Sequence, residues 1–71
     1  MVFQLVYKPS KELVTVAVDV ETFSELFYNA QVRCDFDFYG LVTICDGNGK
    51  ALAEVMKRGS KYEVTRPILE T

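Results

Sequence analysis

Carboxylate, phenol and thiol groups gather in residues 34–46, and these side chains offer the sequence's main prospects for binding or chemistry. Asp35, Asp37, Tyr39 and Leu41 occupy every second position, as do residues on one face of a β-strand. An aromatic ring in such a row can anchor a protein partner, while the carboxylates orient the partner and speed association. We therefore expect Asp35, Asp37, Tyr39 and Leu41 to form a partner-binding surface on the sheet face that no helix covers. The alternative is that the N-terminal hairpin or residues 68–69 cover this face.

Cationic side chains near the end of the chain form a second candidate surface. Residues 1–46 carry three Lys or Arg against seven Asp or Glu, whereas residues 47–71 carry five against three. In the second group, arginines would pair with carboxylate or phosphate groups of a partner. A solvated turn that protects an edge strand is the alternative. The expected partner-binding cations are Lys57, Arg58, Lys61 and Arg66.

The composition removes most catalytic and metal chemistry. The sequence has no histidine, which is the usual general base near neutral pH and the commonest metal ligand. Cys34 and Cys45 are its only cysteines, too few for a closed zinc site. We expect a protein that is not an enzyme and that takes neither a cofactor nor a metal.

Residues 46–50, Asp-Gly-Asn-Gly-Lys, begin like a calcium-binding loop. However, Ala51 stands where that loop needs glycine, and Lys57 stands where it needs glutamate. The spacing of a phosphate-binding loop is also missing. The segment therefore predicts a hairpin turn.

The first half of the chain predicts a β-hairpin followed by a helix. Residues 2–7 and 13–19 alternate between apolar and polar side chains, and Pro9 lies in the expected turn between them. Thr22 and Glu25 have the spacing of a capping box, which marks the start of a helix. A helix of two to three turns would then place one apolar stripe on the sheet: Phe23, Leu26, Phe27 and Ala30.

Residues 34–46 show the clearest alternation, and they predict one long strand with a bend or bulge at Gly40. Cys34, Phe36, Phe38, Val42 and Ile44 would share the face opposite Asp35, Asp37, Tyr39, Leu41, Thr43 and Cys45. In a straight strand the two cysteines would lie about 36 Å apart, whereas a disulfide needs Cα atoms within about 7 Å. We expect free thiols, with Cys34 buried and Cys45 partly exposed.

Residues 51–58 fit either a strand or a helix, and the hairpin turn before them favours the strand. A last strand over residues 62–66 would end at Pro67. The sequence thus predicts one α+β domain over residues 1–71, with a small antiparallel sheet of about five strands in the order ββαβββ and one short helix on one face. The alternative order is ββαβαβ.

The order of elements over residues 22–66 resembles that of small phage-encoded inhibitors, including some anti-CRISPR proteins, which pack one helix on a short antiparallel sheet. The likeness lies in the pattern, without a diagnostic residue. It implies a non-catalytic inhibitor, encoded by a phage or mobile element, that sterically blocks a host complex.

Function classes other than an inhibitor also fit the sequence. The first alternative is a homodimeric structural or regulatory module of a bacterial cell. A weaker alternative is a nucleic-acid-binding module, which the net charge of −2 argues against. With no apolar run of membrane-spanning length, no signal peptide and few cysteines, we expect a cytoplasmic protein that binds another protein.

Overall fold

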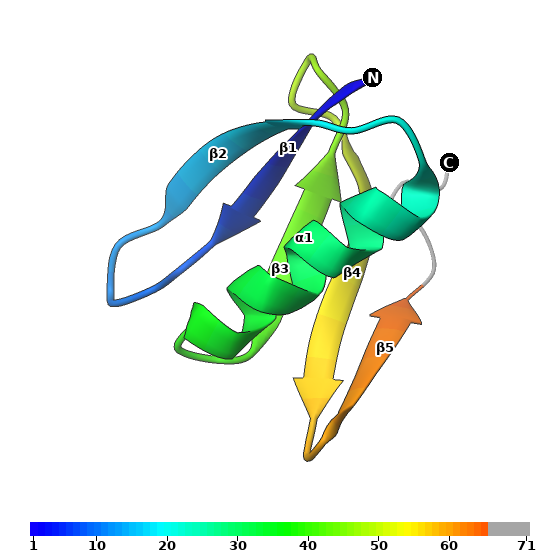
Figure 1. Cartoon of the computed structure of the whole chain (residues 1–71). Coiled ribbons are helices and arrows are strands. Elements are labelled where there is room, and N and C mark those ends of the chain that lie inside the picture. The colour runs from blue at the N-terminus through cyan, green and yellow to red at the C-terminus, as the bar shows by residue number, and fades with distance from the viewer. Residues whose placement is uncertain (66–71) are drawn as a thin grey trace.

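A computed structural model describes residues 1–65. Along the chain lie β1 (Val2–Tyr7), β2 (Val14–Asp19), α1 (Phe23–Phe36), β3 (Leu41–Cys45), β4 (Ala51–Arg58) and β5 (Lys61–Thr65). The five strands form one antiparallel sheet in the spatial order β2-β1-β3-β4-β5, and α1 packs on one face of it (Figure 1). The expected α+β fold of order ββαβββ is confirmed, and residues 51–58 form a strand.

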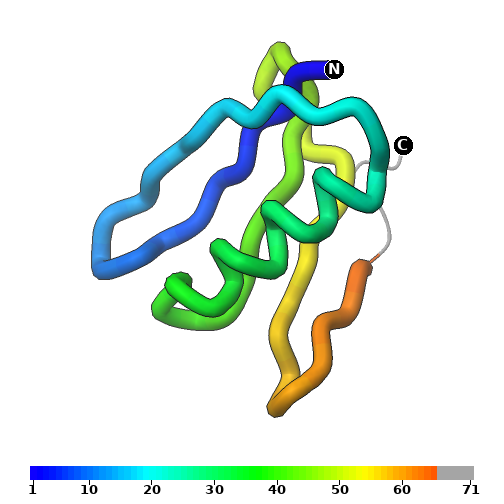
Figure 2. The backbone as a smooth tube through the Cα atoms, viewed as in Figure 1, coloured from blue at the N-terminus to red at the C-terminus, as the bar shows by residue number. Residues whose placement is uncertain are grey.

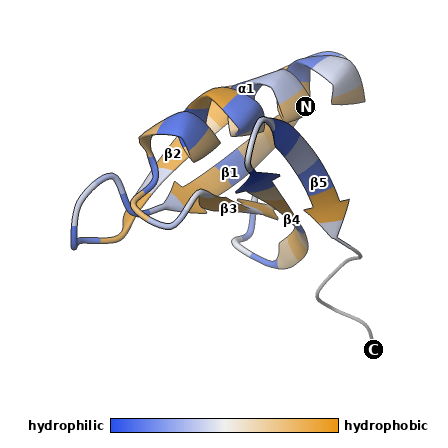
Figure 3. Ribbon diagram, turned by 90° about the horizontal axis from the view of Figure 1, so that it is seen from below, coloured by the Kyte–Doolittle hydropathy of each residue, from blue (hydrophilic) through white to orange (hydrophobic). Residues whose placement is uncertain are grey.

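Strand alternation gives the sheet two unlike faces. On the helix-covered face, buried residues of β1, β3 and β4 contact every fourth residue of α1. The core consists of Leu5, Val20, Leu26, Ala30, Cys34, Val42, Ile44 and Val55. Figure 3 shows α1 above the sheet, and within residues 1–65 no helix or strand covers the opposite face.

The helix starts as the sequence predicts. The Thr22 side chain accepts a hydrogen bond from the Glu25 amide at 3.2 Å, and the Glu25 carboxylate accepts one from the Thr22 amide at 3.2 Å. Leu26 and Ala30 are buried, and Phe27 is half-buried. Phe23, expected in the core, is 61% exposed because it lies at the first helical position, where its ring meets only the edge of the core beside Phe3.

The predicted strand over residues 34–46 is wrong in its first half. α1 continues through Phe36, because Cys34 extends the buried stripe of Leu26 and Ala30 by one more helical step. The chain then turns through Gly40, which has a φ of +71°, a conformation open to glycine at little cost. β3 therefore begins only at Leu41.

The turn between β3 and β4 is the hairpin turn that its glycines predict. The Asp46 carboxylate accepts hydrogen bonds from the amides of Asn48 and Lys50, both at 2.9 Å, and Gly49 has a φ of +87°. The strand register shifts between Ile44 and Cys45. Cys45 is buried, with 5% exposed, rather than partly exposed as expected.

Antiparallel pairing brings three connections to one end of the molecule. These are the β1–β2 turn, the loop of residues 37–40 and the β4–β5 turn, whereas the N-terminus and the β3–β4 turn lie at the opposite end (Figure 2). The one helix of the described residues is too short and too polar to cross a membrane.

Candidate binding surface

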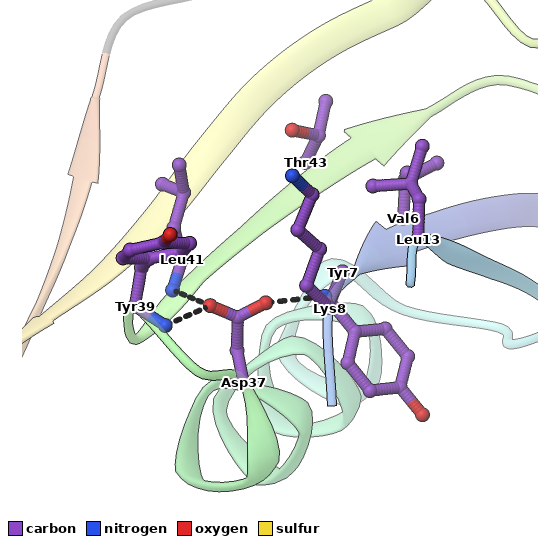
Figure 4. A pocket seen from close by; sticks show the side chains of 8 residues that line it. All are labelled: Val6, Tyr7, Lys8, Leu13, Asp37, Tyr39, Leu41 and Thr43. Carbon is purple, nitrogen blue, oxygen red and sulfur yellow. Dashed lines mark hydrogen bonds between the residues drawn. The ribbon is translucent and has the colours of Figure 1, made fainter. Parts of the chain in front are cut away.

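Asp37 ends α1 and organises the loop after it. Its carboxylate accepts hydrogen bonds from the backbone amides of Lys8, Tyr39 at 2.7 Å and Leu41 at 3.1 Å (Figure 4). The Phe38 amide also donates to the Lys8 carbonyl at 2.7 Å. The loop of residues 37–40 is therefore bonded both within itself and to the turn between β1 and β2.

The negative charge of Asp37 is stabilised by hydrogen bonds within the protein. Burial is the largest influence on the pKa of Asp37 and acts to raise it, but hydrogen bonds from the amides of Lys8, Leu41, Tyr39 and Gly40 together outweigh burial and lower this pKa. The carboxylate is thus ionised at neutral pH and already has donors. Asp37 accordingly holds the loop of the candidate surface in place, and its carboxylate is poorly placed to orient a partner.

Exposed aromatic residues flank Asp37 in the sequence. Phe38 and Tyr39 are 63% and 72% exposed, and their rings meet edge to face with centroids 5.1 Å apart. Phe36 at the end of α1 is 65% exposed, and Leu13 in the β1–β2 turn is 61% exposed. We call Leu13, Phe36, Phe38 and Tyr39 the aromatic end.

Sequence reasoning assigned Phe36 and Phe38 to the core-facing side of a strand and so missed them as surface residues. The available signal was the crowding of three aromatic rings into residues 36–39, just before a glycine. A strand with only one buried face would be expected to carry large aromatic residues mainly on that face, whereas Phe36, Phe38 and Tyr39 would fall on both faces.

A shallow hollow of about 170 Å³ lies beside Tyr39. Val6, Leu41 and Thr43 come from the sheet face without the helix, and Leu13 comes from the adjoining turn. The Lys8 side chain runs along the hollow toward Thr43 (Figure 4). The structure therefore brings three expected partner-binding residues, Asp37, Tyr39 and Leu41, together around one hollow.

Asp35, by contrast, lies on the helix-covered side. Its carboxylate accepts hydrogen bonds from the Lys57 ammonium at 3.0 Å and from the Tyr62 hydroxyl at 2.6 Å. The Lys57 ammonium also lies 5.9 Å from the centre of the Tyr62 ring. The expected row of alternating residues is broken because Asp35 belongs to α1 and not to a strand.

The protonation of this group of three suits a structural contact. Hydrogen bonds from Tyr62 and then Lys57 lower the pKa of Asp35, while the bond to Asp35 raises the pKa of both Lys57 and Tyr62. A catalytic base or nucleophile needs the opposite shift in its lysine or tyrosine. The three side chains join the end of α1 to β4 and β5.

The expected cationic surface is only partly available. Lys57 is paired with Asp35, and Arg58 Nε lies 3.2 Å from a carboxylate oxygen of Glu63. Lys61 is exposed at the start of β5. Arg66 lies outside the described residues, as do Ile68 and Leu69.

The two cysteines are free, and both are buried. The Cys34 thiol donates to the Val55 carbonyl at 3.2 Å. Burial, followed by the nearby charges of Asp37 and Asp35, raises the pKa of Cys34 to about 11, and burial also raises the pKa of Cys45. Within residues 1–65, no three cysteine or carboxylate side chains gather as metal ligands would.

Comparison of this chain with protein-family models, with curated proteins and with solved structures gives no match.

Proposed function

We propose that this protein is a non-catalytic binding module that docks its aromatic end on a protein partner. The observation that carries the proposal is the exposure of Phe36, Phe38 and Tyr39 on a segment that Asp37 holds in place. Water-exposed aromatic rings are costly for a protein to keep together, and clusters of them mark interaction sites. Aromatic side chains are also prominent among the residues that contribute most to protein binding.

The order of the loop adds to the support. Binding costs free energy when mobile groups become fixed, so a surface that is already fixed keeps more of its contact energy. The hydrogen bonds of Asp37 and Phe38 fix this loop before any partner arrives. Tyr39 and Phe38 are therefore presented as a preformed pair.

Inhibition belongs to the same proposal. A domain of 71 residues that covers a patch on a larger protein denies that patch to other molecules without any catalysis. The phage or mobile-element inhibitor implied by the sequence resemblance would act in this way, on a complex of its host.

The experiment is affinity capture with chemical cross-linking from host lysate, followed by competition between purified components. Tyr39→Ala combined with Phe38→Ala should weaken the captured complex at least tenfold, because aromatic anchors each contribute about 2 kcal/mol or more. Tyr28→Ala combined with Phe23→Ala is the matched control, since these residues are exposed to a similar degree, 66% and 61%, near the start of α1. Equal capture by both double variants would refute the proposal.

Sedimentation of the purified protein separates a foreign partner from a second copy. A stable species of about 16 kDa, twice the chain mass of 8.1 kDa, that the Phe38 and Tyr39 double variant dissociates would assign the aromatic end to self-association. A monomer at micromolar concentration agrees with a foreign partner.

A further inference from the structure

We infer that the hollow beside Tyr39 receives an apolar side chain from an acidic segment of a partner protein, with Lys8 pairing with a carboxylate next to that side chain. The inference rests on the proposed binding function and specifies the chemistry of the partner.

The size and lining of the hollow indicate one apolar side chain. The hollow measures about 170 Å³, and an apolar cavity of about 150 Å³ holds a molecule of benzene. Val6, Leu13 and Leu41 contribute aliphatic walls, and Tyr39 adds an aromatic one. One leucine-sized or phenyl-sized group would fit in this open hollow and lose part of its contact with water.

The position of Lys8 indicates a carboxylate beside that side chain. Its backbone is held on both sides, because its amide donates to Asp37 and its carbonyl accepts from Phe38. The ion pairs within residues 1–65 use the N-terminal amine, Lys57 and Arg58, so the Lys8 ammonium has no carboxylate partner among them. An ammonium at the edge of an apolar hollow favours an anionic group on the molecule that fills it.

The surrounding charges favour the same partner. At this end of the molecule, Asp35, Asp37 and Glu63 already have hydrogen-bond donors or a cation within the described chain. Among the described residues, the groups without a charged partner at this end or beside the hollow are four cations and two carboxylates: Lys8, Lys11, Arg33, Lys61, Glu12 and Glu54, the last opposite Thr43 in the register of β3 and β4. Most of the charged groups without a partner are therefore cationic hydrogen-bond donors.

The opposite end of the molecule would repel an acidic partner. By formal charge, four carboxylates lie there against two cations: Asp19, Glu21, Glu25 and Asp46 against Lys50 and the N-terminal amine. By the same count within residues 1–65, cations outnumber carboxylates at the aromatic end and beside the hollow: Lys8, Lys11, Arg33, Lys57, Arg58 and Lys61 against Glu12, Asp35, Asp37, Glu54 and Glu63. This asymmetry within a chain of net charge −2 would orient an acidic partner toward the aromatic end. Four unpaired cations without a wider basic face do not suit the repeated phosphates of a nucleic acid.

The test is selection from a random dodecapeptide display library, with the full chain immobilised as bait. Selected peptides should carry Asp or Glu next to a large apolar residue at least three times as often as the starting library. Synthetic copies should bind about fivefold more weakly to Lys8→Gln, in line with the size of exposed ion pairs. Lys50→Gln, at the opposite end, is the matched control and should bind them as the parent protein does.

In the peptide experiment, the inference would be overturned by selection of peptides without carboxylates, by selection of none, or by equal binding to Lys8→Gln and the parent. An oligothymidylate probe is run in parallel, and binding to it that Lys8→Gln weakens would assign the site to phosphate groups. If a protein partner is captured less by the Phe38 and Tyr39 double variant but equally by Lys8→Gln and the parent, this inference is overturned while the proposed function stays in place.

Discussion

The Cys34 thiol occupies the core between α1 and β4, with 1% of the residue exposed. A thiolate in this position would lose its hydration and lie near the negative charges of Asp37 and Asp35, which is why the pKa is raised to about 11. Cysteine reacts as the thiolate, so Cys34 is chemically inert in the folded protein.

We therefore predict that neither cysteine reacts with iodoacetamide at pH 8 on the folded protein within the time that alkylates both in urea. At a pKa of about 11, roughly one Cys34 thiol in a thousand is ionised at pH 8, and burial blocks access as well. Mass spectrometry counts the added groups, and the variants Cys34→Ser and Cys45→Ser show which thiol reacts. Rapid labelling of Cys34 in the folded protein would contradict a helix that extends to Phe36.

At the scale of the elements, local patterns identify most of the fold. The hairpin of β1 and β2, the capping box of α1 and the turn of residues 46–50 all rest on contacts between residues close in sequence. Such contacts depend on residue types and spacings that can be recognised in a short segment of the sequence. The assignment of β4 as a strand also follows, because the turn before it dictates what comes next.

The end of α1 could not be found in this way. Alternation in residues 34–38 suits a strand, while the spacing of Ala30 and Cys34 suits a helix, and the sequence contains both patterns. The deciding contacts reach across the fold: Cys34 bonds to Val55, and Asp37 bonds to Lys8, 29 residues away. The aromatic end was missed for the same reason, since its exposure depends on where the helix stops.

The start of α1 allows a direct measurement of local stabilisation. We predict that Thr22→Ala lowers the free energy of unfolding by about 1 kcal/mol, because the Glu25 amide loses its acceptor at the helix start. Urea unfolding followed by circular dichroism measures the change. Ser24→Ala is the control, since Ser24 is an exposed neighbour whose side chain makes no hydrogen bond within residues 1–65. Equal losses in the two variants would show that the capping box contributes nothing.

Over the whole molecule, two aspartates link the end of α1 to opposite halves of the sheet. Asp37 bonds to Lys8 beside β1, and Asp35 bonds to Lys57 and Tyr62 on β4 and β5. Between them they join the end of α1 and the loop that presents Phe38 and Tyr39 to the β1–β2 turn and to the two strands that flank the β4–β5 turn. The stability of the domain and the order of its candidate surface therefore depend on the same two carboxylates.

This arrangement predicts a loss of stability in acid. Both aspartates have a pKa below the ordinary value of 3.8 in the folded protein. The unfolded chain thus binds protons more readily, so the stabilisation is complete above that value and is lost as the pH falls through the lowered values. Urea midpoints should change little from pH 7 to about pH 5, and should fall as the pH drops below about 4.

Substitution of the two aspartates tests the origin of the acid effect. Asp35→Asn and Asp37→Asn should each lower the midpoint at pH 7 and make its fall below pH 4 shallower, because an amide does not titrate. Asp37→Asn should in addition broaden or shift the amide resonances of Tyr39 and Leu41, whose N–H groups bond to that carboxylate. Asp19→Asn is the control, since Asp19 pairs with the N-terminal amine at the other end and is 79% exposed. If the Asp35 and Asp37 variants kept the parent's slope in acid, other carboxylates would have to account for it.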